Sequence, residues 1–455
     1  MSRAGWRLGI FGLLLSGCAL GPEPVAPTLQ TPAGYATQIE MDLAATMEPW
    51  WQGFADPKLN QLIDTAVSQN FDVRIAQAQL QQARSIQRAA RADLLPDLDA
   101  YVEAEWLTLL AGDSEIRSER QAGAALGFDV DLFGRLRRSL QSANAEVAGA
   151  AMSIQDLRRV VAQSVALRYI EMKRAQARLG LLTTTLEVQS RTLEIVQSRQ
   201  RAGLSPKLDV DRAAADLAGS RAQQGSLLEV RQNAEYSLSV LVGDFPHRWA
   251  PVAAATVTIP SFRAGPPLGL PADLLRRRPD VRAAEFALVS QIALIGVETA
   301  DLYPRLSLPG IIQADIGSGG SIADMASVSL GALLDLPLLD GGRRRAEVAA
   351  QEARAQEALL QYQQTLLFAL EDVESALVRI TMLLDRQRNL AAAVAASQSA
   401  FQQLDALYRE GLAGFIDVLD VQRTLIASQE NYVDSEAALA TAYVLLYAAL
   451  GDSVD

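Results

Sequence analysis

Long stretches of the chain repeat their apolar residues every three or four positions, which is the spacing of one face of a helix. In the first such stretch, the apolar residues that share a face are Leu59, Leu62, Ile63, Ala66 and Val67. The pattern predicts helices over residues 56–92, 135–201, 208–242, 271–300, 343–409 and 416–450. At about 1.5 Å per residue, each of the two longest helices would be a rod of roughly 100 Å.

Shorter segments alternate apolar and polar residues instead, which indicates strands with two unlike faces. They cover residues 98–106, 122–131, 306–316 and 326–338. Strands of about ten residues with an apolar outer face and a polar inner face fit a membrane β-barrel with a water-filled lumen. A soluble sheet with one wet face fits the same alternation. The acidic residues that we expect on the lumen side are Glu103, Glu105, Asp129, Asp131, Asp315 and Asp335.

Four strands are too few to close a barrel. An open sheet edge in lipid leaves backbone groups without partners, at a cost of several kcal/mol each, and bacterial barrels have about eight strands or more. Either the chain does not span a membrane, or several copies combine their strands.

The whole pattern occurs twice. Asp72 recurs as Asp280 and Gly243 recurs as Gly451, an offset of about 208 residues in both cases. A period this long is not that of a solenoid, whose units have roughly 20 to 50 residues. We therefore expect two equivalent structural halves, residues 56–244 and 271–455, joined by a Pro/Gly-rich connector at residues 245–270.

The N-terminus has the features of a lipoprotein signal. A charged start and a short apolar core precede Leu15-Ser16-Gly17-Cys18, and the apolar core is too short to span a membrane as a helix. Residues 1–17 are therefore expected to be a signal peptide, Cys18 the lipidated first residue of the mature chain, and residues 18–55 an extended leader. An ordinary signal peptide followed by an incidental cysteine is the alternative. No later segment offers about 18 uninterrupted apolar residues.

Composition and charge exclude several classes of function. The net charge of −12 gives no dominant basic face for nucleic acid. The single cysteine excludes an intrachain disulfide. The lone histidine, His247, gives no support to a catalytic dyad or a histidine-based metal site. We therefore expect no enzyme activity and no cofactor other than the covalent lipid on Cys18.

In order and spacing, several short motifs resemble the TolC-like outer-membrane factors, in particular the lipidated branch that serves drug and metal efflux pumps. The resemblance covers nearly the whole chain and departs chiefly at Leu339, where an aromatic residue is usual. Besides the motif at Cys18, it rests on Trp50-Trp51-x-x-Phe54-x-Asp56-Pro57-x-Leu59, Asp129-Val130-Asp131-Leu132-Phe133-Gly134-Arg135, Arg277-Arg278-Pro279-Asp280-Val281 with Glu285, Tyr303-Pro304-x-Leu306 and Pro337-Leu338-Leu339-Asp340-Gly341-Gly342-Arg343.

The resemblance implies a mainly α-helical fold with a membrane β-barrel, in which a homotrimer supplies twelve strands, four from each chain. Paired helices would form an α-helical tunnel through the periplasm. The implied partners are outer-membrane lipid, a periplasmic adaptor protein and an inner-membrane efflux pump. The implied location is the outer membrane, where the chain would conduct substrates passively.

The resemblance also implies a gate at the periplasmic tip, where the two helical breaks would lie. Asp420 and Arg423 match the family's constriction positions, and Ile416 would form an apolar ring. The neighbouring candidates are Asp417, Asp209, Asp211 and Arg212. Threefold symmetry would bring three copies of each acid to one axis, where their potentials add. Acids at helix N-termini, which the helix dipole favours, are the simpler explanation of Asp209 and Asp417.

Two questions about function remain open at the level of sequence. The cargo is not encoded, so drugs, metal ions and other small molecules are possible, and the duct of a type I protein secretion system is the alternative. The second question is whether the chain is a non-conducting coiled-coil lipoprotein, which would leave the strands without a role.

The arginine run at residues 276–278 is expected to be a solvated helix end.

Overall fold

The structure is a computed structural model that describes residues 19–29, 32–37, 49–108, 116–246, 258–262, 277–315 and 326–451. Cys18 and His247 lie outside these residues. The chain divides into two compact units. Unit 1 comprises residues 1–29, 78–152 and 282–365, and unit 2 comprises residues 30–77, 153–281 and 366–455. Each unit therefore contains parts of both sequence halves.

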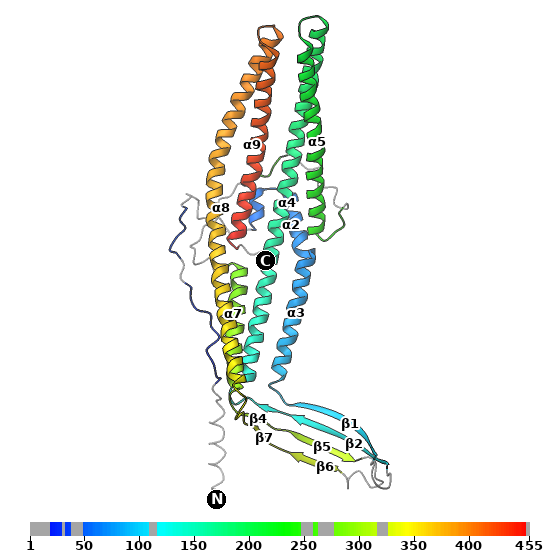
Figure 1. The fold of residues 1–455 in the computed structure, drawn as a ribbon, viewed down its shortest axis with the longest axis vertical. Helices are drawn as coiled ribbons and strands as arrows, with labels where there is room; N and C mark the ends of the chain where they lie inside the picture. The colour runs from blue at the N-terminus through cyan, green and yellow to red at the C-terminus, as the bar shows by residue number, and fades with distance from the viewer. Residues whose placement is uncertain are drawn as a thin grey trace. The chain divides into compact units, whose positions relative to one another are not determined.

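The helices repeat with the offset seen in the sequence. α3 and α7 have 22 residues each, α4 and α8 have 67 each, and α5 and α9 have 35 each. In chain order the helices are η1 (Trp50–Phe54), α2 (Pro57–Gln69), α3 (Phe71–Ala92), α4 (Arg135–Arg201), α5 (Lys207–Leu241), α7 (Pro279–Ala300), α8 (Arg343–Arg409) and α9 (Phe415–Ala449). In unit 2, α5 lies beside α4, and α9 lies beside α8, as two long hairpins (Figure 1).

The helix expected over residues 56–92 is in fact two helices. α2 ends at Gln69 and α3 begins at Phe71, because Asn70 between them is not helical. The side-chain oxygen of Asn70 accepts hydrogen bonds from the backbone N–H groups of Asp72 (2.8 Å) and Val73 (3.4 Å). An asparagine that satisfies the free N–H groups at a helix start favours a new helix over continuation of the old one.

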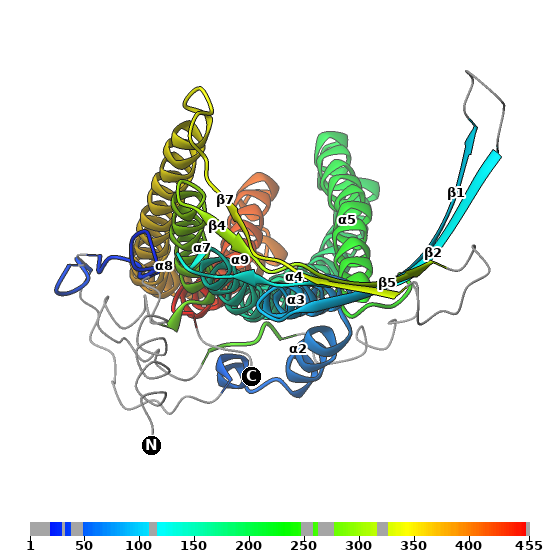
Figure 2. The same cartoon turned by 90° about the horizontal axis from the view of Figure 1, so that it is seen from below.

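The strands lie in unit 1 and form two antiparallel sheets. The strands are β1 (Asp97–Thr108), β2 (Ile116–Gly127), β3 (Asp129–Val130), β4 (Arg305–Ser307), β5 (Gly310–Asp315), β6 (Ala326–Leu330) and β7 (Leu333–Asp335). The larger sheet has the order β1-β2-β5-β6 and the smaller one β3-β4-β7. Figure 2 shows that the larger sheet is curved rather than flat.

Three of the strands expected to be continuous are broken in the structure. The interruptions fall at Phe128, at Leu308-Pro309 and at Gly331-Ala332. Pro309 has no N–H to give to the ladder, and its carbonyl instead accepts a hydrogen bond from Gly331 N at 2.8 Å. Leu308 N donates to Phe128 O at 2.8 Å, so all three interruptions lie in one row across the sheet. This row separates the two sheets.

The core of unit 2 is built around α2, whose predicted apolar face is confirmed. Leu59, Leu62 and Ile63 are completely buried, and burial of each such side chain contributes about 1.5–3 kcal/mol. An aromatic cluster completes this core, with the rings of Trp50 and Tyr447 stacked 6.1 Å apart. Asp56 begins α2 by accepting hydrogen bonds from Lys58 N (2.9 Å) and Leu59 N (3.3 Å).

Among the described residues, α7 is the one helix long and apolar enough to cross a membrane by length and composition alone. Two of its polar side chains, Ser290 and Gln291, have partners within unit 1. Ser290 and Ser142 are hydrogen-bonded at 2.8 Å, and Gln351 donates to the side chain of Gln291 at 2.8 Å. These contacts favour a helix packed against α4 and α8.

Candidate functional site

One face of the larger sheet carries polar side chains from several strands. Glu103 lies opposite Gln121, which lies opposite Asp315, so two carboxylates occupy one row. In the neighbouring row the Tyr101 hydroxyl donates to the Gln313 side-chain oxygen at 3.2 Å, across Gly123 on the strand between them. A Cβ at Gly123 would lie 2.8 Å from the Tyr101 hydroxyl, so this crossing requires glycine.

The predicted lumen acids divide into two groups. Glu103, Glu105 and Asp315 belong to the larger sheet, whereas Asp129 and Asp335 belong to the smaller one. Their exposure to a lumen stays a prediction.

Asp131 is not on a strand at all, because β3 ends at Val130. Its carboxylate accepts hydrogen bonds from Leu136 N and Arg137 N, each at 3.1 Å, and pairs with Arg137 Nε at 3.0 Å. These contacts satisfy free N–H groups at the start of α4. We therefore correct the expectation for Asp131: it is a helix cap.

A cavity of about 170 Å³ lies where the smaller sheet meets the helices of unit 1. Acids and arginines alternate around it. Arg135 lies 3.6 Å from Asp129, and Arg305 lies 2.9 Å from Asp301. The cavity therefore has no uncompensated acidic charge from these residues.

The start of the leader is fixed to the same region of unit 1. Leu20 N donates to Phe133 O at 3.1 Å, and Arg138 donates to the carbonyls of Leu20 (2.9 Å) and Gly21 (3.1 Å). Gly21 has φ +83°, and a Cβ there would lie 2.6 Å from Gly296 Cα. Ala19 is the first residue of this segment that the structure describes. The lipidation of Cys18 therefore stays a prediction.

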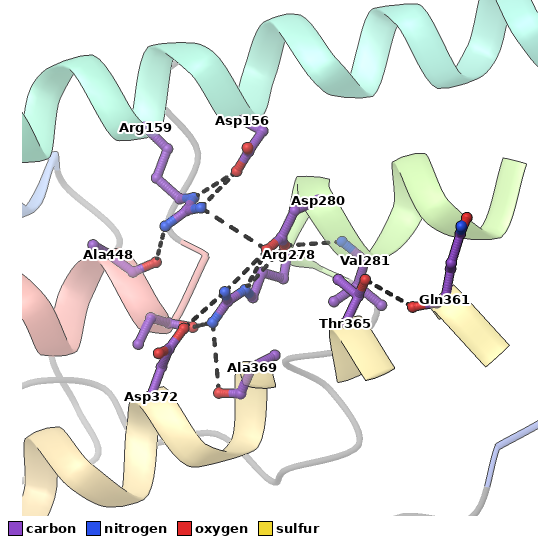
Figure 3. Close-up of polar contacts among 11 residues, drawn as sticks. Asp156, Arg159, Arg278, Asp280, Val281, Gln361, Thr365, Ala369, Asp372 and Ala448 are labelled. Carbon is purple, nitrogen blue, oxygen red and sulfur yellow. Dashed lines mark hydrogen bonds and ion pairs between the residues drawn. The ribbon is translucent and has the colours of Figure 1, made fainter. Parts of the chain in front are cut away.

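In unit 2, a buried arginine lies where α7 begins. Arg278 is only 6% exposed. It donates to Asp280 at 2.9 Å, to Asp372 at 2.9 Å and to the carbonyl of Ala449 at 3.3 Å (Figure 3). Arg159 joins the same network through Asp280, 4.0 Å away, and it also pairs with Asp156 (2.6 Å) and donates to the carbonyl of Ala448 (2.8 Å).

This network corrects the expectation of a solvated helix end. Burial by itself would lower the pKa of Arg278, but hydrogen bonds and charge from Asp280 and then Asp372 outweigh burial and raise that pKa. Arg278 is therefore a charged group that connects the start of α7 to α8 and to the end of α9. The sequence offers one signal for it: the equivalent position in the first half is Asn70, which donates to Leu241 O at 3.0 Å.

The candidate gate residues lie near the breaks between the long helices of unit 2. Ile416, Asp417 and Asp420 are exposed on α9. Asp417 accepts a hydrogen bond from Gly414 N at 3.3 Å, and both Asp417 and Asp209 lie in the first turn of a helix. The positions of Asp209 and Asp417 therefore agree with the simpler helix-dipole explanation.

Arg423 has a partner that the sequence did not reveal. Its Nη2 lies 2.7 Å from Asp216 Oδ1, and this hydrogen bond and charge raise the pKa of Arg423. Asp216 lies about two helical turns after Asp209, on the same face of α5. This spacing is the sequence signal that could have indicated Asp216 as a residue of the tip. The pair connects α9 to α5.

The remaining candidates at the tip have other surroundings. Asp211 pairs with Lys207 at 2.8 Å on the surface of α5, and Arg212 is half-buried. A second connection between the hairpins comes from Arg199, which donates to Tyr408 O at 3.1 Å and lies over the Tyr408 ring. The structure therefore joins Arg423 to Asp216 rather than to the candidates from sequence.

The fold and these sites together define a channel-forming subunit. The sheet has a polar face on which Glu103 and Asp315 share one row, and the long helix pairs end in a tip with its own apolar cluster. The described residues contain no group of three or more His, Cys, Asp or Glu that could hold a metal ion.

The family model for outer membrane efflux proteins matches residues 62–244 and 270–452. The chain therefore belongs to the outer membrane efflux protein family, and it is an outer-membrane efflux channel subunit.

Individual relatives align with this chain over nearly their whole length. The chain is 29% identical to nodulation protein T of Rhizobium leguminosarum bv. trifolii, covering 97% of this chain and 96% of the relative. It is 31% identical to the pyoverdine export outer membrane protein OpmQ of Pseudomonas putida, with 94% and 93% covered. The solved structure of the outer-membrane channel OprN has a TM-score of 0.84 at 30% identity, covering 94% of this chain and 99% of that one.

Proposed function

We propose that three copies of this chain form one twelve-stranded barrel in the outer membrane, continued by an α-helical tunnel in the periplasm. The observation that carries this proposal is the larger sheet itself. Among the described strands, β1 and β6 each have a neighbour on one side only. The outward side chains of both strands are apolar and exposed. Closure with further copies would remove free edges that lipid cannot solvate.

Planar-bilayer recording combined with native mass measurement in detergent tests this proposal. We expect trimers with a stable conductance. A protein that is a monomer in detergent and gives no conductance would contradict the proposed trimeric channel.

We propose that Cys18 carries the lipid anchor. The hydrogen bonds of Leu20 and Gly21 to Phe133 and Arg138 support this, because they hold the residues after Cys18 next to the strands. Mass spectrometry of the mature N-terminus tests it. An unacylated cysteine would rule out the anchor.

The periplasmic tip is the proposed gate and docking end. Exposed acids at Asp417 and Asp420 would be repeated three times around one axis, where their potentials add. The Arg423–Asp216 pair would hold neighbouring hairpins together in the closed state. Leu204 and Leu412, about 70% exposed at equivalent positions of the two breaks, offer apolar contacts to a periplasmic adaptor protein.

Substitution of the acids tests the gate separately from the duct. Asp420→Ala is expected to raise the closed-state conductance, and Asp211→Ala is the matched acidic control on the other hairpin. An unchanged closed state in Asp420→Ala would remove Asp420 from the gate.

The cargo is proposed to be whatever an inner-membrane pump delivers through the adaptor. The name of one relative refers to pyoverdine export, which supports small molecules over polypeptides. Export assays in a strain that lacks its own duct test this. Accumulation of a small toxic substrate despite expression of the chain would favour the protein-secretion alternative.

A further inference from the structure

The two junctions between strand and helix in unit 1 differ in the partner that they give to an arginine. In the first half, Asp131 caps α4 and pairs with Arg137 at 3.0 Å. The equivalent residues 208 positions later are Leu339 and Arg345. Leu339 has no carboxylate to offer, and it is 95% exposed. The second junction therefore lacks the partner that the first one supplies.

A cavity of about 430 Å³ lies at this second junction, between the residues after β7 and the start of α8. Its lining combines two exposed leucines, Leu338 and Leu339, with Arg344, Arg345 and Tyr303. Arg345 is exposed and Arg344 is half-buried. Among the residues that the structure describes, neither guanidinium group has a hydrogen-bond or ion-pair partner. The cavity thus offers an apolar wall and two free cations.

The acidic groups nearby are already engaged. Asp340 lines the cavity, but its carboxylate accepts hydrogen bonds from Gly342 N at 2.9 Å and from Arg344 N at 3.2 Å. Asp340 therefore occupies the free N–H groups at the start of α8, and the helix end itself is not an anion site. The third arginine of the run, Arg343, pairs with Glu347 at 2.7 Å. An excess of positive charge remains at Arg344 and Arg345.

The cavity lies beside the proposed lipid anchor. Leu20 N donates to Phe133 O at 3.1 Å, and the Phe133 ring lies 4.9 Å from the ring of Tyr303, which lines the cavity. Cys18 precedes Leu20 by two residues. In unit 1, β4 and β7 meet the ends of α7 and α8 at this level (Figure 1). An acyl chain on Cys18 would therefore enter the membrane next to the cavity, in the leaflet that faces the periplasm.

We propose that this cavity binds the headgroup of an anionic phospholipid of the periplasmic leaflet. Arg344 and Arg345 hold the phosphate, and the acyl chains lie along Leu338 and Leu339. Guanidinium groups bind phosphate oxygens through paired N–H groups, and basic pockets at a membrane surface select anionic headgroups. Acyl chains of the anchor alone would leave both arginines without a partner. This inference rests on the proposed barrel, which brings the strand ends to the membrane surface, and adds a ligand to it.

Native mass spectrometry of the intact protein in detergent, titrated with phosphatidylglycerol or phosphatidylcholine of the same acyl chains, tests the site. We expect one phosphatidylglycerol for each chain, bound about tenfold or more tightly than phosphatidylcholine, because the two headgroups differ in net charge. A bound lipid adds its own mass to that of the acylated chain, so the measurement distinguishes it from the anchor.

Two variants should remove the preference by different routes. Arg344→Gln combined with Arg345→Gln deletes both cations. Leu339→Asp keeps them but copies the first half, since it gives Arg345 a carboxylate in the place of Asp131. Each should weaken the binding of phosphatidylglycerol by about tenfold and leave phosphatidylcholine unchanged. The matched control is Arg379→Gln with Arg386→Gln, two exposed arginines of the same helix, and it should bind both lipids as the parent does.

Three results would overturn the headgroup site. The parent could bind the two lipids equally, or the preference could survive in both the arginine variant and Leu339→Asp. Displacement of the bound lipid by excess inorganic phosphate would assign the two arginines to a free phosphate instead.

The mass of the assembly and its conductance in planar bilayers separate this inference from the proposed function. A conducting trimer without a preference for phosphatidylglycerol would remove the headgroup site and leave the barrel intact. A monomer without conductance would contradict the barrel itself. A conducting trimer that loses its bound phosphatidylglycerol only in the two site variants supports both.

Discussion

The two halves of this protein share a backbone but not their buried charges. At the start of α7, Arg278 reaches the carbonyl of Ala449; at the start of α3, Asn70 reaches the carbonyl of Leu241. These are equivalent contacts, offset by 208 residues. The second half makes its contact with a cation held by two carboxylates, whereas the first half makes it with a neutral amide.

The charge is distributed differently in the first half. Lys173 on α4 is completely buried beside the Tyr169 ring, and the Tyr169 hydroxyl donates to Asp56 at 2.8 Å. Thr381, the equivalent of Lys173, donates its hydroxyl to the backbone of its own helix. Lys173 is thus buried where the second half has Thr381, and Arg278 is buried where the first half has Asn70. The repeat therefore conserves helix lengths and strand register more strictly than the charges between helices.

The largest effect is expected from the helix junctions. Arg278→Ala removes a buried cation and leaves Asp280 with Arg159, 4.0 Å away, as its remaining charged partner. The loss should cost about 2–4 kcal/mol per chain, since Asp372 is partly screened by solvent. Asn70→Ala removes a cap and one hydrogen bond, for about 1–2 kcal/mol. Melting temperatures of the purified protein should fall in that order.

Arg277→Ala is the matched control, because Arg277 is an exposed neighbour. It should stay within about 0.5 kcal/mol of the parent. Equal losses for Arg278→Ala and Asn70→Ala would mean that the charge contributes nothing beyond the shared contact.

The second comparison concerns the two glycines at equivalent places in the hairpins. A Cβ at Gly123 would lie 2.7 Å from the Ile312 carbonyl oxygen, whereas at Gly331 the nearest atom is 3.6 Å away. Gly123→Ala should therefore destabilise the protein by about 1–3 kcal/mol, and Gly331→Ala should be nearly neutral. The temperature at which the folded band disappears on a gel measures the difference; a reversed order would contradict the crossing of Tyr101 over Gly123.

The third comparison concerns the tips of the two hairpins. Arg423→Ala breaks the pair with Asp216, an exposed interaction worth about 0.2–1 kcal/mol. The probability of the open state in planar bilayers should rise by a few fold or less. Arg212→Ala, on the other hairpin, should leave the opening unchanged. An equal rise in both variants would show that the tip responds to total charge rather than to this pair.

The smallest expected effect at neutral pH is the pH dependence of stability that Lys173 causes. Burial lowers the pKa of Lys173, although the charge of Asp56 opposes this. The unfolded chain therefore binds more protons than the folded one between that lowered pKa and the ordinary 10.5, so stability should rise with pH in this window.

Burial also raises the pKa of Tyr169, so above its ordinary value of 10.0 the tyrosine should reverse the trend. Melting temperatures between pH 7 and pH 10 should increase less in Lys173→Thr, which copies the second half, than in the parent. A parallel increase in both proteins would assign the slope to other groups.

The local pattern of the sequence determined most of the fold. The helix pairs and the four-strand sheet follow from periodicity, because long amphipathic runs specify their own secondary structure. The break at Asn70 was missed because its cause is a side-chain cap rather than a gap in the apolar pattern. The division at Phe128, Pro309 and Gly331 was missed because it depends on how separate strands align.

The candidate sites were harder to predict from the sequence than the fold was. Asp131 continues the alternation of apolar and polar residues that predicts the strand. The strand ends one residue earlier, however, and the Asp131 carboxylate caps a helix. Arg278 reads as part of an exposed basic run, and only the packing of α8 and α9 around it creates a buried ion pair. The Arg423–Asp216 pair joins residues 207 positions apart, which no local pattern can reveal.

The equal length of α4 and α8, at 67 residues each, limits how this protein can change in evolution. One residue inserted into either helix turns everything beyond it by about 100° and lifts it by about 1.5 Å. The contacts of Arg199 with Tyr408 and of Arg423 with Asp216 tolerate neither change on one side alone. Insertions and deletions in these helices should therefore be inherited in matched pairs, one in each half.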